Sequence, residues 1–152
     1  MWAHTLERLQ EAAPSLGLTL ESVAARGSDE LDAALAAATG AGAAAVFVVY
    51  DGLFTTHRQR IADLAASRRL PIIAGDRALV EAGGLMSYGV HFPAMLRRLA
   101  QYVDRIVKGA KPHDLAIEQA TTFELSINLK TARTLGLTVP RAVLLRANHV
   151  IE

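Results

Sequence analysis

Ser87 is the first residue to test for chemistry, because it lies at the end of a predicted strand and Gly89 follows two residues later. The nucleophile elbow of serine hydrolases needs the pattern G-x-S-x-G, and Leu85 stands here in the place of its first glycine. We therefore interpret Ser87 as a hydrogen-bonding group in a loop, and we do not expect catalysis.

Other reactive or metal-binding patterns are also incomplete. Asp51 follows a strand as a receiver-domain phosphoacceptor does, but the acidic pair and the lysine of that chemistry are missing. No two histidines are three or four residues apart, so a metal site on a helix lacks its spacing. The glycines at 40 and 42 precede a strand, and no phosphate-loop motif occurs. We predict neither a metal nor a cofactor.

The remaining polar and aromatic groups are suited to hold a small polar or zwitterionic molecule. Asp51 and Asp76 could accept hydrogen bonds from an ammonium group, and Phe54 and Tyr88 could cover an apolar body. Each has an ordinary alternative: Asp76 as a helix cap, Asp51 as a turn residue and Phe54 as core or interface. The predicted ligand-binding set is Asp51, Leu53, Phe54, Gly75, Asp76, Ser87 and Tyr88.

These residues fall in three predicted loops, 51–54, 75–77 and 87–89, and hydrophobic periodicity predicts the elements that position the loops. Strands are expected at residues 18–23, 43–50, 71–75, 85–89 and 123–127, separated by helices at about 2–16, 28–39, 55–69, 78–82, 93–108 and 129–135. This alternation is typical of an α/β fold with a three-layer open parallel sheet, which binds ligands beyond the carboxyl ends of its strands. We expect one lobe over residues 1–152, with a core at 1–90, a long helix and crossover at 91–128, and a terminal helix and tail at 129–152.

The composition limits the classes of partner that the chain is expected to bind. The net charge of +1 gives no broad attraction for nucleic acid, and no apolar run reaches the ~20 residues that span a bilayer. There is no cysteine, so disulfides and thiolate sites are excluded. The first residues, MWAHTLERLQEAAPSLG, carry charges where a signal peptide needs an apolar stretch, so the chain as written is expected to stay in the cytoplasm.

Four sequence segments are similar to those of a known family: EAGGLMSYG at 81–89, QYVDRIVKGAKPHDLAIEQ at 101–119, FELSINLKTARTLGLTVP at 123–140, and the ending LLRANHVIE. The chain resembles the carboxy-terminal portion of ABC transporter substrate-binding proteins of the tryptophan and tyrosine type, which have the type I periplasmic-binding-protein fold. The resemblance implies a flavodoxin-like lobe that forms one wall of a ligand cleft, an ABC permease as partner, and an extracytoplasmic location.

The resemblance also implies that a first lobe, an export signal and the first strand of this lobe are missing from the sequence as written. In a flavodoxin-like order that strand lies inside the sheet, so its loss would leave unpaired backbone groups and apolar surface. We therefore expect a homo-oligomer or strand-exchanged dimer, or a fragment of a longer product.

Three functions follow in order of preference. The first is a solute-binding lobe of an importer that holds an aromatic or branched amino acid without catalysis. The second is a stand-alone homo-oligomeric interaction module with the same fold, and the third is an unrecognised α/β enzyme.

Overall fold

The computed structural model describes residues 2–152 and divides the chain into two compact units, Met1–Ala43 and Ala44–Glu152. The first unit contains α1 (Trp2–Ala12), the 3-10 helix η1 (Ala13–Leu16) and α2 (Leu31–Gly40). Gly17 ends η1 in the left-handed conformation, at φ 68°, and its amide donates hydrogen bonds to the carbonyls of Ala13 and Pro14.

The strand predicted at residues 18–23 does not form, and this expectation was wrong. Residues 18–25 have no regular secondary structure, and Leu18 and Val23 leave their side chains exposed. An isolated extended segment has no ladder of hydrogen bonds and no face to bury, so an apolar alternation alone cannot hold it as a strand. The helix predicted from residue 28 begins at Leu31, after a turn in which the Glu30 carboxylate accepts from the amide of Arg26 at 2.8 Å.

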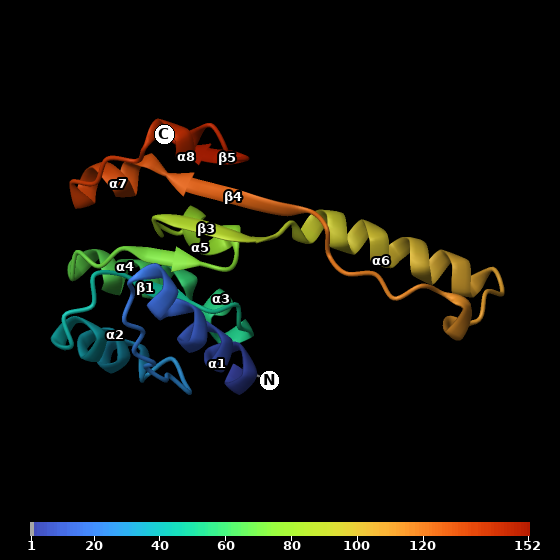
Figure 1. Cartoon of the computed structure of the whole chain (residues 1–152), viewed down its shortest axis with the longest axis horizontal. Helices are drawn as coiled ribbons and strands as arrows, with labels where there is room; N and C mark the ends of the chain where they lie inside the picture. Colours follow the sequence, from blue (N-terminus) through green and yellow to red (C-terminus); the bar gives the residue numbers. More distant parts are fainter. Residues whose placement is uncertain (1) are drawn as a thin grey trace. The chain divides into compact units, whose positions relative to one another are not determined.

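The second unit is built on a five-stranded sheet in the order β1-β2-β3-β4-β5 (Figure 1). Its strands are β1 (Val46–Val48), β2 (Ile72–Ala74), β3 (Met86–Val90), β4 (Phe123–Asn128) and β5 (His149–Ile151). β1, β2 and β3 are parallel, β4 runs antiparallel to β3, and β5 is parallel to β4. The open parallel sheet expected from the alternation is confirmed except at β4. This strand runs antiparallel to β3, because the chain leaves β3, travels outward along a helix and comes back in the opposite direction.

The second unit also contains six α-helices: α3 (Gly52–Thr56), α4 (Arg58–Ser67), α5 (Arg77–Glu81), α6 (Phe92–Val107), α7 (Leu129–Leu135) and α8 (Arg141–Leu144). A 3-10 helix, η2 (Pro112–Asp114), lies within the crossover predicted at 91–128. The loop predicted at residues 51–54 is mostly helix α3, and the single helix predicted at about 55–69 is divided between α3 and α4. α4 instead starts at Arg58 after His57, which makes no side-chain cap.

α5 covers one face of the central strands, where the core of the second unit lies. Leu79 and Val80 of α5 are almost fully buried, as are Ile72 and Ile127 of the strands. The Asn128 amide donates to the carbonyl of Val80 at 3.1 Å, and so ties the end of β4 to this helix. Burying side chains of this size stabilises the fold by about 1.5–3 kcal/mol each.

None of the 16 residues of α6 is buried, as in the much shorter helices α3 and α8. α6 continues past the end of β3, and residues 108–122, which we call the return segment, lead back beside it to β4 (Figure 1). Among the described residues no helix has the length and apolar character needed to cross a membrane.

Candidate functional site

The carboxyl ends of β1, β2 and β3 lie at one edge of the sheet, because these three strands are parallel and paired in register. Val48 pairs with Ala74, and Ala74 pairs with Ser87, so the residues that follow each strand lie near one another. Two of the predicted loops, residues 51–54 and 75–77, begin here, and we call this region the strand-end edge. The third expectation was wrong: Ser87, Tyr88 and Gly89 are not in a loop but within β3, where they pair with β4.

Two aspartates stand at this edge, and each is the N-cap of a short helix. Asp51 accepts a hydrogen bond from the amide of Leu53 at 2.8 Å and begins α3, and Asp76 accepts from the amide of Leu79 at 3.2 Å and begins α5. The capping role that we weighed for Asp76 is therefore present, and Asp51 has it too. A carboxylate offers about four lone-pair sites, so capping one amide does not exhaust its capacity to accept.

The backbone is unusually close-packed between β2 and β3 at this edge. A Cβ atom on Gly89 would overlap the carbonyl oxygen of Gly75 and lie 2.8 Å from its carbonyl carbon. A Cβ on Gly75 would lie 3.6 Å from the Cβ and the amide nitrogen of Tyr50. Gly75 and Gly89 therefore allow three chain segments to meet, which keeps Asp51 and Asp76 near the ends of their strands.

Aromatic rings flank the edge in two pairs. Tyr88 stacks on Phe123 with ring centroids 5.7 Å apart and an angle of 15° between the planes, and Tyr50 contacts Phe92 at 4.9 Å and 33°. Tyr88 is 62% exposed, so most of its surface remains open to a ligand. Tyr50, Phe92 and Phe123 were not among the predicted site residues. Each is an aromatic residue close to the end or at the start of a predicted helix or strand, and this position was the signal in the sequence that could have identified them.

The other predicted residues lie in two environments. Leu53 and Phe54 are half-buried in α3, beside the edge. Ser87 is only 1% exposed and pairs across the strands with Ser126, on the face of the sheet that α5 covers. In this conformation the Ser87 hydroxyl is closed off from solvent, and neither it nor the Ser126 hydroxyl has a hydrogen-bond partner among the described residues.

The chain crosses from the sheet to α6 and back next to this edge. The amide of His91 donates to the carbonyl of Thr122 at 3.0 Å, which joins the outgoing and returning segments. The His91 Nδ1 accepts from the amide of Ala94 at 3.2 Å and caps α6, while its Nε2 lies 4.0 Å from the Glu124 carboxylate. Since Nδ1 accepts, the proton of a neutral His91 is on Nε2 and points to Glu124.

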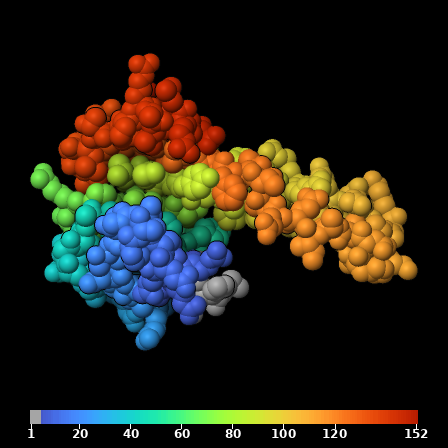
Figure 2. Space-filling model, viewed as in Figure 1, coloured from blue at the N-terminus to red at the C-terminus, as the bar shows by residue number. Residues whose placement is uncertain are grey.

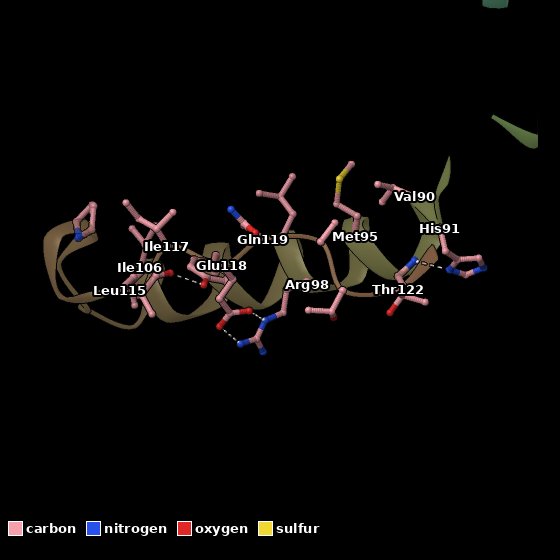
Figure 3. A pocket seen from close by; sticks show the side chains of 17 residues that line it. Val90, His91, Met95, Arg98, Ile106, Leu115, Ile117, Glu118, Gln119 and Thr122 are labelled. Atoms are coloured by element: carbon pink, nitrogen blue, oxygen red, sulfur yellow. Dashed lines mark hydrogen bonds and ion pairs between the residues drawn. The ribbon is translucent and has the colours of Figure 1, made fainter. Parts of the chain in front are cut away.

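A groove of about 690 Å³ begins beside Val90 and His91 at the end of β3 and extends between α6 and the return segment (Figure 3). Arg98 holds the return segment there by hydrogen bonds to both carboxylate oxygens of Glu118, and Tyr102 donates to the carbonyl of Ala116 at 2.6 Å. The hydrogen bond from Arg98 lowers the pKa of Glu118, and the same bond raises the pKa of Arg98. Three polar side chains of the groove, Arg98, Glu118 and Tyr102, are thus engaged in holding the return segment against α6.

No group of three or more metal-ligating side chains gathers within residues 2–152 as described. The strand-end edge thus offers two carboxylates, exposed aromatic surface and close-packed glycine backbone. Such an arrangement can bind a molecule that has a cationic head and an apolar or aromatic body.

Comparison with solved structures gives two close matches in fold. A conserved domain protein from Vibrio cholerae O1 biovar El Tor is 26% identical, with a TM-score of 0.89, and the match covers 97% of this chain and 50% of that one. An ABC domain from Streptococcus pneumoniae, solved in complex with L-Trp, is 28% identical with a TM-score of 0.88, covering 98% and 51%. This chain therefore spans about half the length of both structures.

A third structure shows the same fold at 18% identity and a TM-score of 0.70, covering 98% of this chain and 50% of that one; it is the ligand-free, open form of a substrate-binding protein with adhesive properties from Clostridium difficile. No curated protein matches the chain. The family model described as ABC transporter substrate binding protein matches residues 3–151, nearly the whole sequence. The chain belongs to the ABC transporter substrate binding protein family.

Proposed function

We propose that this chain is a solute-binding lobe that holds an amino acid with an aromatic or branched side chain at the strand-end edge, as one wall of a cleft. The observation that carries the proposal is the convergence of Asp51, Asp76 and the exposed Tyr88 at the carboxyl ends of three parallel strands. Family membership supports it, and so does the L-Trp bound to the Streptococcus pneumoniae domain.

The proposed contacts divide by chemistry. Asp51 and Asp76 accept from the ammonium group, Tyr88 stacks on the side chain, and Leu53 and Phe54 supply apolar surface. Gly75 permits close approach of the ligand to the backbone. Ser87 is retained from the predicted set, but its hydroxyl would reach a ligand only if α5 shifted.

Binding without catalysis fits the groups at the edge. A nucleophile needs a neighbouring base within hydrogen-bond reach, and Ser87 has no hydrogen-bond partner among the described residues. We further propose delivery of the solute to an ABC permease in an extracytoplasmic compartment, as the family implies. A stand-alone interaction module is the second candidate, favoured by the exposed apolar surface of α6.

Isothermal titration calorimetry with L-tryptophan, L-phenylalanine and L-leucine tests the solute-binding proposal. One wall buries only part of a ligand and cannot close around it, so we expect weak binding, with a dissociation constant of about 0.1–1 mM. No heat with any of these amino acids, from folded protein at millimolar ligand, would refute solute binding by this chain.

Asp76→Asn is the sharpest variant, because asparagine keeps the capping oxygen and removes only the charge. If Asp76 holds an ammonium group, affinity should fall about 10–100-fold while the melting temperature barely changes. Asp63→Asn, an exposed carboxylate of α4 away from the edge, is the matched control and should bind as wild type does.

A further inference from the structure

The strand-end edge carries carboxylates for the ammonium group of a solute, but its donors for a solute carboxylate are already in use. Asp51 and Asp76 each have a carboxylate oxygen bonded to a backbone amide, of Leu53 and Leu79 respectively. These amides belong to the first turns of α3 and α5, which is where a ligand anion would otherwise find unpaired donors. The protein's own carboxylates therefore occupy the positions that a ligand carboxylate needs.

Glu124 is a third carboxylate close to this edge. It pairs in register with Gly89, whose backbone packs against the carbonyl of Gly75, and Asp76 follows Gly75. Since only β3 separates β2 from β4, the backbones of these two strands are about 10 Å apart. Glu124 lies two residues before Ser126, so its side chain projects to the same face of the sheet, the one that α5 covers. Glu124 and Asp76 therefore lie on either side of Gly89.

The Glu124 carboxylate has little contact with water and no close partner. Its side chain is 14% exposed, and the His91 Nε2 lies 4.0 Å away, which is too long for a hydrogen bond. No other hydrogen bond of this carboxylate is found within residues 2–152. Both residues lie at the crossing, from which α6 and the return segment extend side by side (Figure 2). A carboxylate so far withdrawn from water is costly without a partner, and a donor from a ligand would offset that cost.

The arginines nearest to the edge along the chain are bound to other groups. The Arg77 Nε donates to the Glu81 carboxylate at 2.7 Å, and the Arg58 guanidinium donates to the carbonyl of Thr55 at 3.0 Å. The segments that form the edge and the crossing, 50–56, 75–77, 90–92 and 122–124, contain no lysine, and Arg77 is their one arginine. This wall therefore offers a ligand several acceptors, while its nearby cations already have partners.

From this charge pattern we propose that the strand-end edge prefers positively charged amines that lack a carboxylate, and that Glu124 is a further acceptor for their ammonium group. The inference rests on the proposed function, because it concerns which solutes the same edge binds. The ammonium group lies among Asp51, Asp76 and Glu124, and the apolar body lies against the aromatic rings of the edge. The carboxylate of an amino acid is repelled by the same three groups.

Isothermal titration calorimetry with three ligands that share an indole ring tests this preference. Tryptamine carries only the ammonium group, L-tryptophan carries both groups, and indole-3-propionate carries only the carboxylate. Because the three carboxylates attract one charge and repel the other, we expect tryptamine to bind about 10-fold more tightly than L-tryptophan, and indole-3-propionate to give no heat. The preference should shrink in about 1 M salt, which screens charges that are open to water.

Glu124→Gln keeps the size of the side chain and removes its charge. We expect this variant to weaken tryptamine binding about 10-fold and L-tryptophan binding about 3-fold, so that the preference for the amine becomes smaller. A purely structural role of Glu124 would weaken both ligands alike and leave their ratio unchanged. Asp63→Asn, which removes an exposed carboxylate of α4 away from the edge, is the matched control and should bind both ligands as wild type does. Circular dichroism confirms that both variants are folded.

Three results overturn the inference, and they can be told apart. L-tryptophan binding as tightly as tryptamine would mean that its carboxylate finds a partner on this wall, and it would leave solute binding intact. An unchanged ratio of the two affinities in Glu124→Gln would remove Glu124 from the site. No heat with tryptamine and L-tryptophan alike would refute solute binding itself, and the preference with it.

Discussion

Replacing Gly89 with alanine is expected to damage both the fold and the strand-end edge. The added Cβ would overlap the Gly75 carbonyl oxygen and lie 2.8 Å from its carbon, whereas carbon atoms pack at about 3.5–4.0 Å. The obstacle is backbone, so no rotamer change relieves it, and β2 and β3 must separate by at least ~0.7 Å at this point.

The cost follows from that separation. Overpacking a core with extra methyl groups costs typically 1–3 kcal/mol, and a clash with hydrogen-bonded backbone belongs at the upper end, so we expect a loss of about 3 kcal/mol of unfolding free energy. For a chain of this length that lowers the melting temperature by roughly 6–12 °C. Solute binding should weaken as well, because the β2–α5 loop that carries Asp76 has to move.

Urea denaturation followed by circular dichroism measures the effect, with Gly52→Ala as the matched control. Gly52 also lies at the strand-end edge, but a Cβ there meets nothing within 4 Å. As the first residue of α3 it should tolerate alanine and gain up to about 1 kcal/mol from lower chain entropy in the unfolded state. If Gly89→Ala unfolds within 0.5 kcal/mol of wild type, the close approach of β2 and β3 is not a real constraint.

Three further changes test other parts of the structure. Ser126→Ala should stabilise the protein by about 1 kcal/mol in the same denaturation assay, because it removes a buried hydroxyl that has no partner among the described residues; a loss above 1 kcal/mol would mean that the hydroxyl is bonded. His91→Ala should cost about 1 kcal/mol by removing the N-cap of α6, and His91→Asn should restore most of it. The pKa of Glu118 is lower in the folded state than in the unfolded state, where it is about 4.3. Glu118 therefore stabilises the folded state above the unfolded pKa, and this contribution is lost as the pH falls through the folded pKa. Amide exchange of the return segment, corrected for intrinsic rates, should therefore rise below about pH 4 in wild type, and Glu118→Gln should show fast exchange without this step.

Local patterns were sufficient to predict most elements of the second unit. The spacing of apolar residues predicted a helix at 93–108, and α6 runs Phe92–Val107; the alternation at 123–127 predicted β4, which runs Phe123–Asn128. The run at 43–50 predicted β1, but only Val46–Val48 pairs with β2. Although the whole run is apolar, β1 can pair only over the length of its neighbour β2, which has three residues.

Longer-range features could not be predicted in this way. The strand expected at 18–23 needs a neighbour to pair with, and no residue pattern inside the segment reports whether one is present. The antiparallel direction of β4 depends on α6 running outward and the return segment running back, whereas alternation of apolar residues is the same in both directions. The stacking of Tyr88 on Phe123 depends on the antiparallel pairing of β3 with β4, so it could not be predicted from local patterns either.

The strand-end edge differs in the kind of partner it suits from the exposed apolar stripe of α6, which consists of Leu96, Leu99, Val103 and Val107. The edge combines carboxylates with exposed aromatic rings within a few residues of three strand ends, which matches a molecule the size of an amino acid. The stripe extends from Leu96 to Val107, a length of about 16 Å at 1.5 Å per residue, and has no polar group to orient a small ligand. A protein surface has the extent that is needed to cover it. Because Val90 and His91 connect β3 to α6 directly, whatever covers the stripe also fixes the crossing beside the edge. A partner on α6 should therefore affect solute affinity even though it touches none of the solute's proposed contacts.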